Sequence, residues 1–272
     1  MSGRPKRSLS QNFLVDPNLR RKLVEELNPS EGDVILEVGP GHGELTELLL
    51  ERADRVVAIE KDDELAAELE ARWGSDPRLV IVHGDGLEVD LLADLPASAP
   101  YSIISNIPYA ITTPLIFRFL ELEPPPRRIV ATVQREVADR IVAAPGSKAY
   151  GALSVGVQVR AKARIAFKVG RQAFRPVPGV DSAAIVMDRR ADALPAAAFA
   201  DVRRLTRAAF GQRRKQLQKI LRSAPDLGLN PDSVEAVLEQ TGLEGRMRPE
   251  ELSPQQFVSL AARIADVAER QR

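Results

Sequence analysis

Apolar runs alternate with amphipathic segments through the first half of the chain. The runs rich in β-branched residues predict strands, and the segments between them have the apolar spacing of helices. The predicted strands are 33–39, 55–60, 78–85, 101–105 and 128–134. The predicted helices are 44–52, 63–73, 113–122 and 136–144. This alternation favours a mostly parallel sheet with helices on both faces.

The alternation ends after the turn residues at 144–151. Two further strands are predicted at 153–169 and 182–189, with the proline-rich sequence FRPVPGVD between them and no helical pattern. Two strands that follow one another in this way are typical of an antiparallel edge on an otherwise parallel sheet.

From about residue 190 onward the pattern is helical only. The predicted helices lie near 196–210, 213–223, 231–240 and 254–269. We therefore place a domain boundary at 190–195. It separates an α/β domain of residues 1–190 from a helical domain of residues 191–272.

Composition narrows the class of protein. With 44% hydrophobic residues among 272, the chain is long and apolar enough for two cores. It has no Cys and only two His, which argues against a disulfide framework, thiolate chemistry or a dedicated metal site. The sequence contains no signal-peptide pattern and no apolar run of about 20 residues, so we expect a soluble, cytoplasmic protein.

The charges balance over the whole chain. Lys plus Arg and Asp plus Glu both number 38, which gives a net charge of zero. Any surface that binds a nucleic acid must therefore be a local one.

A glycine-rich turn follows the first predicted strand. Gly39, Gly41 and Gly43 precede a predicted helix, and glycines at this point let the backbone turn sharply and approach a ligand closely. The spacing is G-x-G-x-G and not the G-x-G-x-x-G of dinucleotide enzymes, which weakens an NAD interpretation. The glycines taken alone could also be an ordinary strand-to-helix turn.

Acidic residues end the first three strands. Glu60 lies 21 residues after Gly39, close to the spacing of about 20 at which an acid binds ribose hydroxyls. Asp85 ends the third strand, and Glu37 precedes the glycines. Each acid alone could be a helix cap or a solvated strand end. Together they would repel a pyrophosphate, and they suit an adenosine joined to a cationic sulfonium, so S-adenosylmethionine fits better than NAD.

The fourth predicted strand ends at the same edge, in the sequence SNIPY. The amide oxygen of Asn106 and a neighbouring backbone carbonyl can accept the two hydrogens of an exocyclic amine, and Pro108 stiffens the turn. Tyr109 offers a ring on which a base can stack. Adenine N6 needs two acceptors because its lone pair is delocalised until its geometry is drawn toward tetrahedral. A structural turn with Tyr109 in the core is the alternative.

Seven segments and Glu60 together resemble one enzyme family. The segments are QNFLVD, EVGPGHGELT, GDGL, NIPYAITTPLIF, QREVADRIVAAPGSKAYGALSV, FRPVPGVDSA and AAFGQRRKQL. They resemble the bacterial 16S rRNA adenine N6-dimethyltransferases, from about Leu9 to Phe257. The resemblance implies a Rossmann-like, S-adenosylmethionine-dependent methyltransferase domain and a small helical C-terminal domain.

The same resemblance implies a substrate and a partner. Four methyl groups would be transferred to N6 of two adjacent adenosines in the 3'-terminal hairpin of 16S rRNA. The partner would be the small ribosomal subunit or its precursor, with a role in ribosome biogenesis, and we expect the enzyme to be a monomer.

The resemblance also assigns cofactor-binding residues. Asn12 and Leu14 match positions at the methionine end of the cofactor, with Gln11 beside them. Glu60 matches the acid for the ribose, and Asp85 the acid for the cofactor adenine. The complete expected set is Gln11, Asn12, Leu14, Gly39, Gly41, Glu60, Asp85 and Asn106.

Three residues are expected at the target base. Asn106 matches the residue shared by the cofactor and the target amine, and Tyr109 and Phe174 match two aromatic faces that hold the flipped adenine. Phe174 could equally anchor the double-proline loop that follows it.

A basic stretch at 201–222 holds eight Lys and Arg residues against Asp201 alone. It predicts a local positive surface for RNA phosphates, with a solvated helix face as the alternative. The expected RNA-binding residues are Arg203, Arg204, Arg207, Arg213, Arg214 and Lys215. The sequence RPKR at 4–7 is a second candidate contact.

Two positions depart from the family pattern. Ser10 stands where a glycine is common, and Gly179 stands where a lysine is frequent. We expect the second departure to weaken one RNA contact and neither to reach the methyl group.

Other functions remain open at this point. A 23S rRNA adenine methyltransferase of the antibiotic-resistance type shares the catalytic parts, although TTPLIF, PGSKAYGALSV and FGQRRK favour the 16S enzymes. A DNA adenine methyltransferase would need a target-recognition domain, which the sequence does not suggest. A ribosome-assembly factor without activity is the third alternative, and the glycine turn, the acids and NIPY argue against it.

Overall fold

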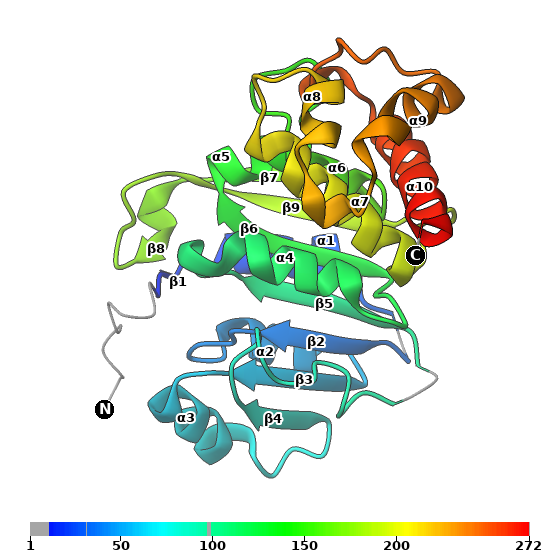
Figure 1. Cartoon of the computed structure of the whole chain (residues 1–272). Coiled ribbons are helices and arrows are strands. Elements are labelled where there is room, and N and C mark those ends of the chain that lie inside the picture. Colours follow the sequence, from blue (N-terminus) through cyan, green and yellow to red (C-terminus); the bar gives the residue numbers. More distant parts are fainter. Residues whose placement is uncertain (1–10, 31, 97–98, 272) are drawn as a thin grey trace. The chain divides into compact units, whose positions relative to one another are not determined.

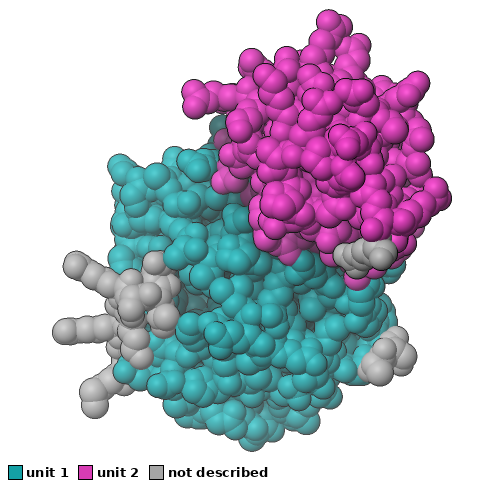
Figure 2. Space-filling view, in the orientation of Figure 1, with its two compact units in different colours: residues 1–138, 163–189 teal, residues 139–162, 190–272 magenta. Residues whose placement is uncertain are grey.

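The computed structural model describes residues 11–30, 32–96 and 99–271 (Figure 1). It divides into two compact units (Figure 2). Unit 1 takes the chain up to Ala138 together with Ala163–Arg189, and unit 2 takes Asp139–Lys162 together with the chain from Arg190 onward. Unit 2 thus includes residues 139–162, which the predicted boundary at 190–195 assigns to the first domain.

The central sheet has seven strands in the order β4-β3-β2-β5-β6-β9-β7. Their bounds are β2 Val34–Val38, β3 Arg55–Glu60, β4 Leu79–His83, β5 Tyr101–Asn106, β6 Arg128–Gln134, β7 Ala161–Val169 and β9 Ser182–Arg189. Strands β2 to β6 pair in parallel, and β9 pairs with β6 antiparallel. The predicted parallel sheet with an antiparallel strand is confirmed.

A second, two-stranded sheet joins two distant parts of unit 1. Strand β1 (Phe13–Leu14) pairs antiparallel with β8 (Phe174–Arg175), so that Leu14 lies opposite Phe174. The backbone N–H of Val15 extends the ladder by donating to the carbonyl of Ala173 at 2.8 Å. Figure 1 shows this small sheet on the side of the central sheet where the parallel strands end.

Five α-helices begin in the described part of the first half of the chain. They are α1 Pro17–Leu27, α2 Glu44–Leu50, α3 Asp63–Trp73, α4 Thr112–Glu121 and α5 Arg135–Ile141. The sequence analysis did not include α1. Its Asp16 side chain accepts from the backbone N–H groups of Asn18 and Leu19, and Pro17 takes the first helical position.

The predicted strand at 153–169 is wrong in its first half. Residues 152–158 form helix α6, and only Ala161–Val169 is a strand. Leu153, Val155 and Val157 are buried together with the residues between them. A helix buried on every side loses its polar face, so its valine-rich sequence resembles a strand.

Unit 2 is helical. Its other helices are α7 Ala196–Gly211, α8 Leu217–Arg222, α9 Val234–Thr241 and α10 Pro254–Arg270. Helix α6 packs against α7 and α10. The hydroxyl of Tyr150 donates to the carbonyl of Leu252 at 2.9 Å. The backbone N–H of Gly146 donates to the backbone carbonyl of Glu250 at 2.7 Å. These bonds attach the 144–151 turn to the C-terminal helices, which explains why 139–162 belong to unit 2.

Within the described ranges, no helix combines the length and the apolar character that a membrane span requires.

Candidate active site

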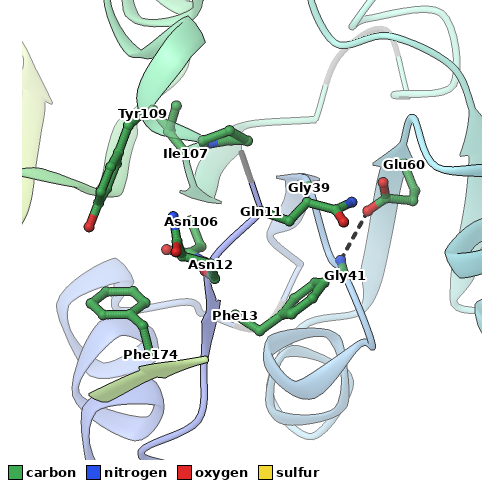
Figure 3. A pocket seen from close by; sticks show the side chains of 11 residues that line it. Gln11, Asn12, Phe13, Gly39, Gly41, Glu60, Asn106, Ile107, Tyr109 and Phe174 are labelled. Carbon is green, nitrogen blue, oxygen red and sulfur yellow. Dashed lines mark hydrogen bonds between the residues drawn. The ribbon is translucent and has the colours of Figure 1, made fainter. Parts of the chain in front are cut away.

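Two adjoining pockets lie in unit 1 at the carboxyl ends of the parallel strands. The first, here called the asparagine pocket, is shown in Figure 3. It is lined by Gln11, Asn12, Phe13, Gly39, Gly41, Glu60, Asn106, Ile107, Pro108, Tyr109 and Phe174. The second, here called the acid pocket, encloses about 800 Å³ including its open mouth. The two pockets share Gln11, Gly39, Glu60 and Pro108.

The glycine turn contributes to both pockets. Gly39 lines both of them, and Gly41 lines the asparagine pocket. Gly39, Gly41 and Gly43 have φ values of 77°, 62° and 82°, in the left-handed region that favours glycine. A Cβ at Gly41 would lie 3.0 Å from the ring of Phe13, whereas a Cβ at Gly39 would meet nothing within 4 Å. The turn is therefore closed by Phe13 at Gly41 and open at Gly39, where a ligand can approach the backbone.

Glu60 joins the second strand to this turn. One carboxylate oxygen accepts the N–H of Gly41 at 3.0 Å, shown as the dashed line in Figure 3, and the other accepts the N–H of Asp62 at 2.9 Å. Burial raises the pKa of Glu60, and the backbone hydrogen bonds oppose that shift. A carboxylate has about four acceptor positions, so the Glu60 oxygens can still accept from a ligand.

Glu37 lies deeper, just before the glycine turn. Its side chain is buried, and one oxygen accepts the hydroxyl of Thr46 at 2.6 Å. The other oxygen has no hydrogen-bond partner among the described residues. Burial, with Glu60 and Glu44 nearby, raises the pKa of Glu37 to about 8.

Asp85 lies in the acid pocket with Ile59, Ile111 and Leu115. Lys61 Nζ donates to one carboxylate oxygen at 2.6 Å, and the N–H of Leu87 donates to the other at 2.9 Å. Burial favours the neutral acid, but the hydrogen bonds from Lys61 and Leu87 outweigh it and leave the pKa of Asp85 below its ordinary value. Asp85 is therefore an anion beside an apolar wall.

The side chain of Asn106 ends strand β5 inside the asparagine pocket. Its Nδ2 donates to the backbone carbonyl of Asn12 at 2.9 Å. A carbonyl can accept only from the NH₂ group, so this bond fixes which way the amide points. The Oδ1 atom is left as an acceptor for another donor.

Two aromatic rings share the pocket with Asn106. In Figure 3 Tyr109 lies above the level of Asn106 and Phe174 below it. The hydroxyl of Tyr109 forms a 2.6 Å hydrogen bond with Ser182 Oγ, and burial raises the pKa of Tyr109, so the hydroxyl stays protonated. Phe174 is 1% exposed and is held by the β1–β8 pairing.

The structure brings together most of the residues predicted for the site. Asp85 lines the acid pocket, and the rest of the predicted set lines the asparagine pocket with one exception. The exception is Leu14, whose side chain is buried in the core and whose carbonyl accepts from Arg20 Nε at 2.6 Å. Its neighbour Phe13 lines the pocket instead.

The sequence analysis missed Phe13, Lys61 and Ser182. Phe13 lies inside the quoted segment QNFLVD and Ser182 inside FRPVPGVDSA, but an apolar residue and a serine have no spacing that separates them from core positions. Lys61 follows Glu60 directly, and only the parallel pairing of β3 with β4 brings it to Asp85.

The predicted RNA-binding residues are not equivalent within unit 2. Arg213 donates to the carbonyls of Lys148 and Ser147 at 2.9 and 3.2 Å, and it also pairs with Glu250 at 3.4 Å. It therefore holds the 144–151 turn. Arg204 pairs with Asp201 at 2.5 Å.

Three other members of the set, Arg207, Arg214 and Lys215, are exposed. Arg213, Arg214 and Lys215 lie in the turn between α7 and α8, since α8 begins at Leu217 and not at the predicted 213. The predicted contact RPKR at 4–7 lies outside the described residues.

Comparison with known proteins agrees with this geometry. Residues 3–266 match the family model described as ribosomal RNA adenine dimethylase. The chain belongs to this family. A relative from Chelativorans sp. named ribosomal RNA small subunit methyltransferase A is 44% identical over 264 residues, which cover 95% of this chain and 93% of the relative. The predicted family and enzyme class are confirmed.

Two solved structures share the fold. A dimethyladenosine transferase from Plasmodium falciparum has a TM-score of 0.78 and 25% identity, over 91% of this chain and 95% of its own. The 23S rRNA methyltransferase ErmE has a TM-score of 0.66 and 28% identity, over 93% of this chain and 100% of its own. The predicted methyltransferase fold is confirmed.

Proposed function

We propose that this dimethylase uses S-adenosylmethionine to methylate N6 of two adjacent adenosines in the 3'-terminal hairpin of 16S rRNA, within the small ribosomal subunit or its precursor. The observation that carries the proposal is the oriented Asn106 amide, which presents Oδ1 in the same pocket as two aromatic rings. The adjoining acid pocket supplies space for an adenosine.

The residues of the acid pocket fit S-adenosylmethionine. Glu60 has unused acceptor positions for ribose hydroxyls, and Ile59, Ile111 and Leu115 offer an apolar wall for the adenine. Open space at Gly39 allows close approach to the backbone. When bound, the cofactor supplies an electrophilic methyl group on a sulfonium, and the Glu60 and Asp85 carboxyl groups that line the acid pocket favour a cation nearby.

The residues of the asparagine pocket fit a flipped adenine. Tyr109 and Phe174 can stack against its faces, and Asn106 Oδ1 can accept one hydrogen of the amine. Fixing the amine in line with the methyl group can lower the barrier by about 7 to 11 kcal/mol through orientation. The amine loses its proton to water after transfer, so the chain needs no general base.

Exposed basic residues of unit 2 support an RNA substrate. Arg207, Arg214 and Lys215 are exposed, so they are available to phosphates, whereas Arg213 is already engaged by the 144–151 turn. We assign phosphate binding to these three residues. Charge removal at Arg214 should lower RNA affinity, and the same change at Arg213 should also lower the stability of unit 2.

The test is transfer of labelled methyl groups from S-adenosylmethionine to small ribosomal subunits that lack the modification. Naked 16S rRNA, 23S rRNA and DNA serve as parallel substrates, and the products are identified by nucleoside analysis. We expect N6,N6-dimethyladenosine in the small-subunit sample alone. Label in 23S rRNA would show that 23S rRNA, and not 16S rRNA, is the substrate. Tight binding to the particle with no label in any RNA or DNA would favour an assembly factor without activity.

A further inference from the structure

A basic segment of unit 1 borders the asparagine pocket and has no part in the site described so far. The 18 residues from 163 to 180 contain Arg164, Lys168, Arg171 and Arg175 and no Asp or Glu. All four side chains are exposed. Arg164 pairs with Glu26, whereas no ion pair among the described residues engages Lys168 or Arg171.

This segment is fixed to the pocket by the small sheet. Arg175 lies opposite Phe13 in the β1–β8 ladder, and Phe13 lines the asparagine pocket. Phe174, which precedes Arg175, lines the same pocket. At its other end the segment leads through Asp181 into Ser182, whose hydroxyl binds Tyr109. The segment therefore contains one aromatic residue of the pocket, Phe174, and leads to the serine that bonds the other, Tyr109.

Hydrogen bonds hold the segment in one conformation. The carboxylate of Asp181 accepts the N–H of Arg171 at 3.0 Å, and its carbonyl accepts the N–H of Arg135 at 3.0 Å. Arg175 Nη1 donates to the carbonyls of Gln172 and Phe174 at 3.0 and 2.8 Å. A surface that is already ordered loses little conformational entropy when it binds a partner.

Two apolar side chains protrude from the same segment. Val177 is 44% exposed and Val180 is 48% exposed, and they are the large hydrophobic residues that remain exposed in the described chain. Pro178 between them is buried. The valines follow the pocket residue Phe174 by three and six positions.

We propose that residues 168–180 are an RNA-docking surface that receives the strand on either side of the target adenosine. Lys168, Arg171 and Arg175 bind its phosphates, and Val177 and Val180 pack against the bases that lose a stacking neighbour when the adenine leaves the helix. This inference rests on the proposed function, since it requires an RNA substrate with a flipped adenine.

Charge and shape both favour this occupant. A segment with four cations and no anion attracts a polyanion, and the phosphates nearest the target must lie close to the pocket mouth. A base that loses its stacking neighbour exposes an apolar face, and proteins that unstack bases commonly place apolar side chains against it. The surface therefore contacts RNA through phosphates and base faces, without reading base edges.

The experiment compares three changes in the full chain. Lys168→Gln with Arg171→Gln removes two charges, and Val177→Ser with Val180→Ser removes the apolar contacts. Gly179→Lys adds a charge where a Cβ would meet nothing within 4 Å. Arg52→Gln is the matched control, because Arg52 is exposed and precedes β3, at the amino ends of the parallel strands and away from the pockets at their carboxyl ends. Gly179→Ser controls for loss of the glycine.

Binding to small subunits is measured across a series of salt concentrations, and methyl transfer gives KM and kcat. Removing the two charges should weaken binding about tenfold and lower the salt slope by about 2. Gly179→Lys should tighten binding and raise the slope by about 1. The serine variant should raise KM with little change in kcat or in the salt slope.

Each negative outcome points to a different failure. If the natural chain methylates the particle and all three variants match Arg52→Gln, the docking surface is overturned while the proposed function stands. If the natural chain methylates no RNA, the proposed function itself fails. Circular dichroism and cofactor affinity equal to those of the natural chain show that the variants are folded.

Discussion

The two sides of the active site carry opposite charges. The acid side, at the end of β3 and just after β4, presents Glu60 and Asp85. The target side, formed by the end of β7 and the segment that follows it, carries Lys168 and Arg171 and no acid before Asp181. A chain of zero net charge thus separates its charges within one unit. The difference supports the proposal that a cationic cofactor binds on one side and a polyanionic substrate on the other.

The largest effect is expected at the boundary between the two sides. Asn106→Ala removes the oriented acceptor, and we expect methyl transfer to fall by roughly 100- to 1,000-fold, as when a single transition-state hydrogen bond is removed. Cofactor binding should be retained in part, because the acid pocket is unchanged. Transfer of labelled methyl groups and calorimetric titration with the cofactor measure the two effects.

Asn18→Ala is the control for this prediction, since Asn18 lies in α1 and bonds Arg21 on the surface. Near-normal turnover of Asn106→Ala would rule out the role assigned to the amide.

The next effect tests the acid side alone. Glu60→Gln preserves the shape of the side chain but removes its charge, so hydrogen bonds worth about 1.5 to 3 kcal/mol each are weakened. We expect cofactor affinity to fall about tenfold to hundredfold. RNA affinity measured without cofactor should not change. Equal losses in both affinities would mean that the two sides are not separate.

Glu37 makes the stability of the folded chain depend on pH. Its carboxyl group ionises near 4.5 when unfolded and near 8 in the folded chain. Between these values the folded chain holds a proton that the unfolded chain has lost, so stability falls as pH rises, by at most roughly 1.4 kcal/mol per pH unit. Glu37→Gln has no such proton, so its stability should fall less steeply over this range.

Urea unfolding of both chains, from about pH 5 to about pH 8, measures this difference in slope. The Gln side chain can still accept the hydroxyl of Thr46, so the comparison isolates the charge. Parallel stability profiles for the two chains would contradict a buried proton on Glu37.

The smallest effect is expected on the target side. Tyr109→Phe keeps the ring for stacking and removes only the hydrogen bond to Ser182, which is worth about 0.5 to 1.5 kcal/mol. We expect a loss of kcat/KM of a few fold, and Ser182→Ala should give a similar loss. The double variant should lose less than the sum of the two, because both changes remove the same bond, and a strictly additive result would show that the bond has no part in holding the ring.

Strands that are buried along nearly their whole length were predicted closely from the sequence. The predicted ranges 128–134 and 182–189 coincide with β6 and β9, because each is an apolar run bounded by polar residues. Helix α1 was missed, since charged residues such as Arg20, Arg21 and Glu25 interrupt its short apolar stripe. Its start signal was the pair Asp16 and Pro17, which cap the helix.

Site residues that lie at the end of a predicted strand could be predicted from the sequence. Asn106 and Tyr109 follow β5 directly, so their proximity to the glycine turn follows from the parallel sheet. Phe174 reaches them only through the β1–β8 ladder, which joins residues 160 positions apart and leaves no local pattern. The role of Arg213 also depends on a contact with the distant 147–148 carbonyls. Spacing along the chain carries no information on such pairs.

The β1–β8 ladder has a consequence for how the enzyme is made. Apart from Gln11, the acid pocket is built from residues 38–115, so its strands can assemble early in translation. The asparagine pocket is complete only when Phe174 has emerged and paired with a strand synthesised some 160 residues before. A nascent chain therefore completes the acid pocket before the asparagine pocket, which under the proposed function means that it can hold the methyl donor before it can hold the target base.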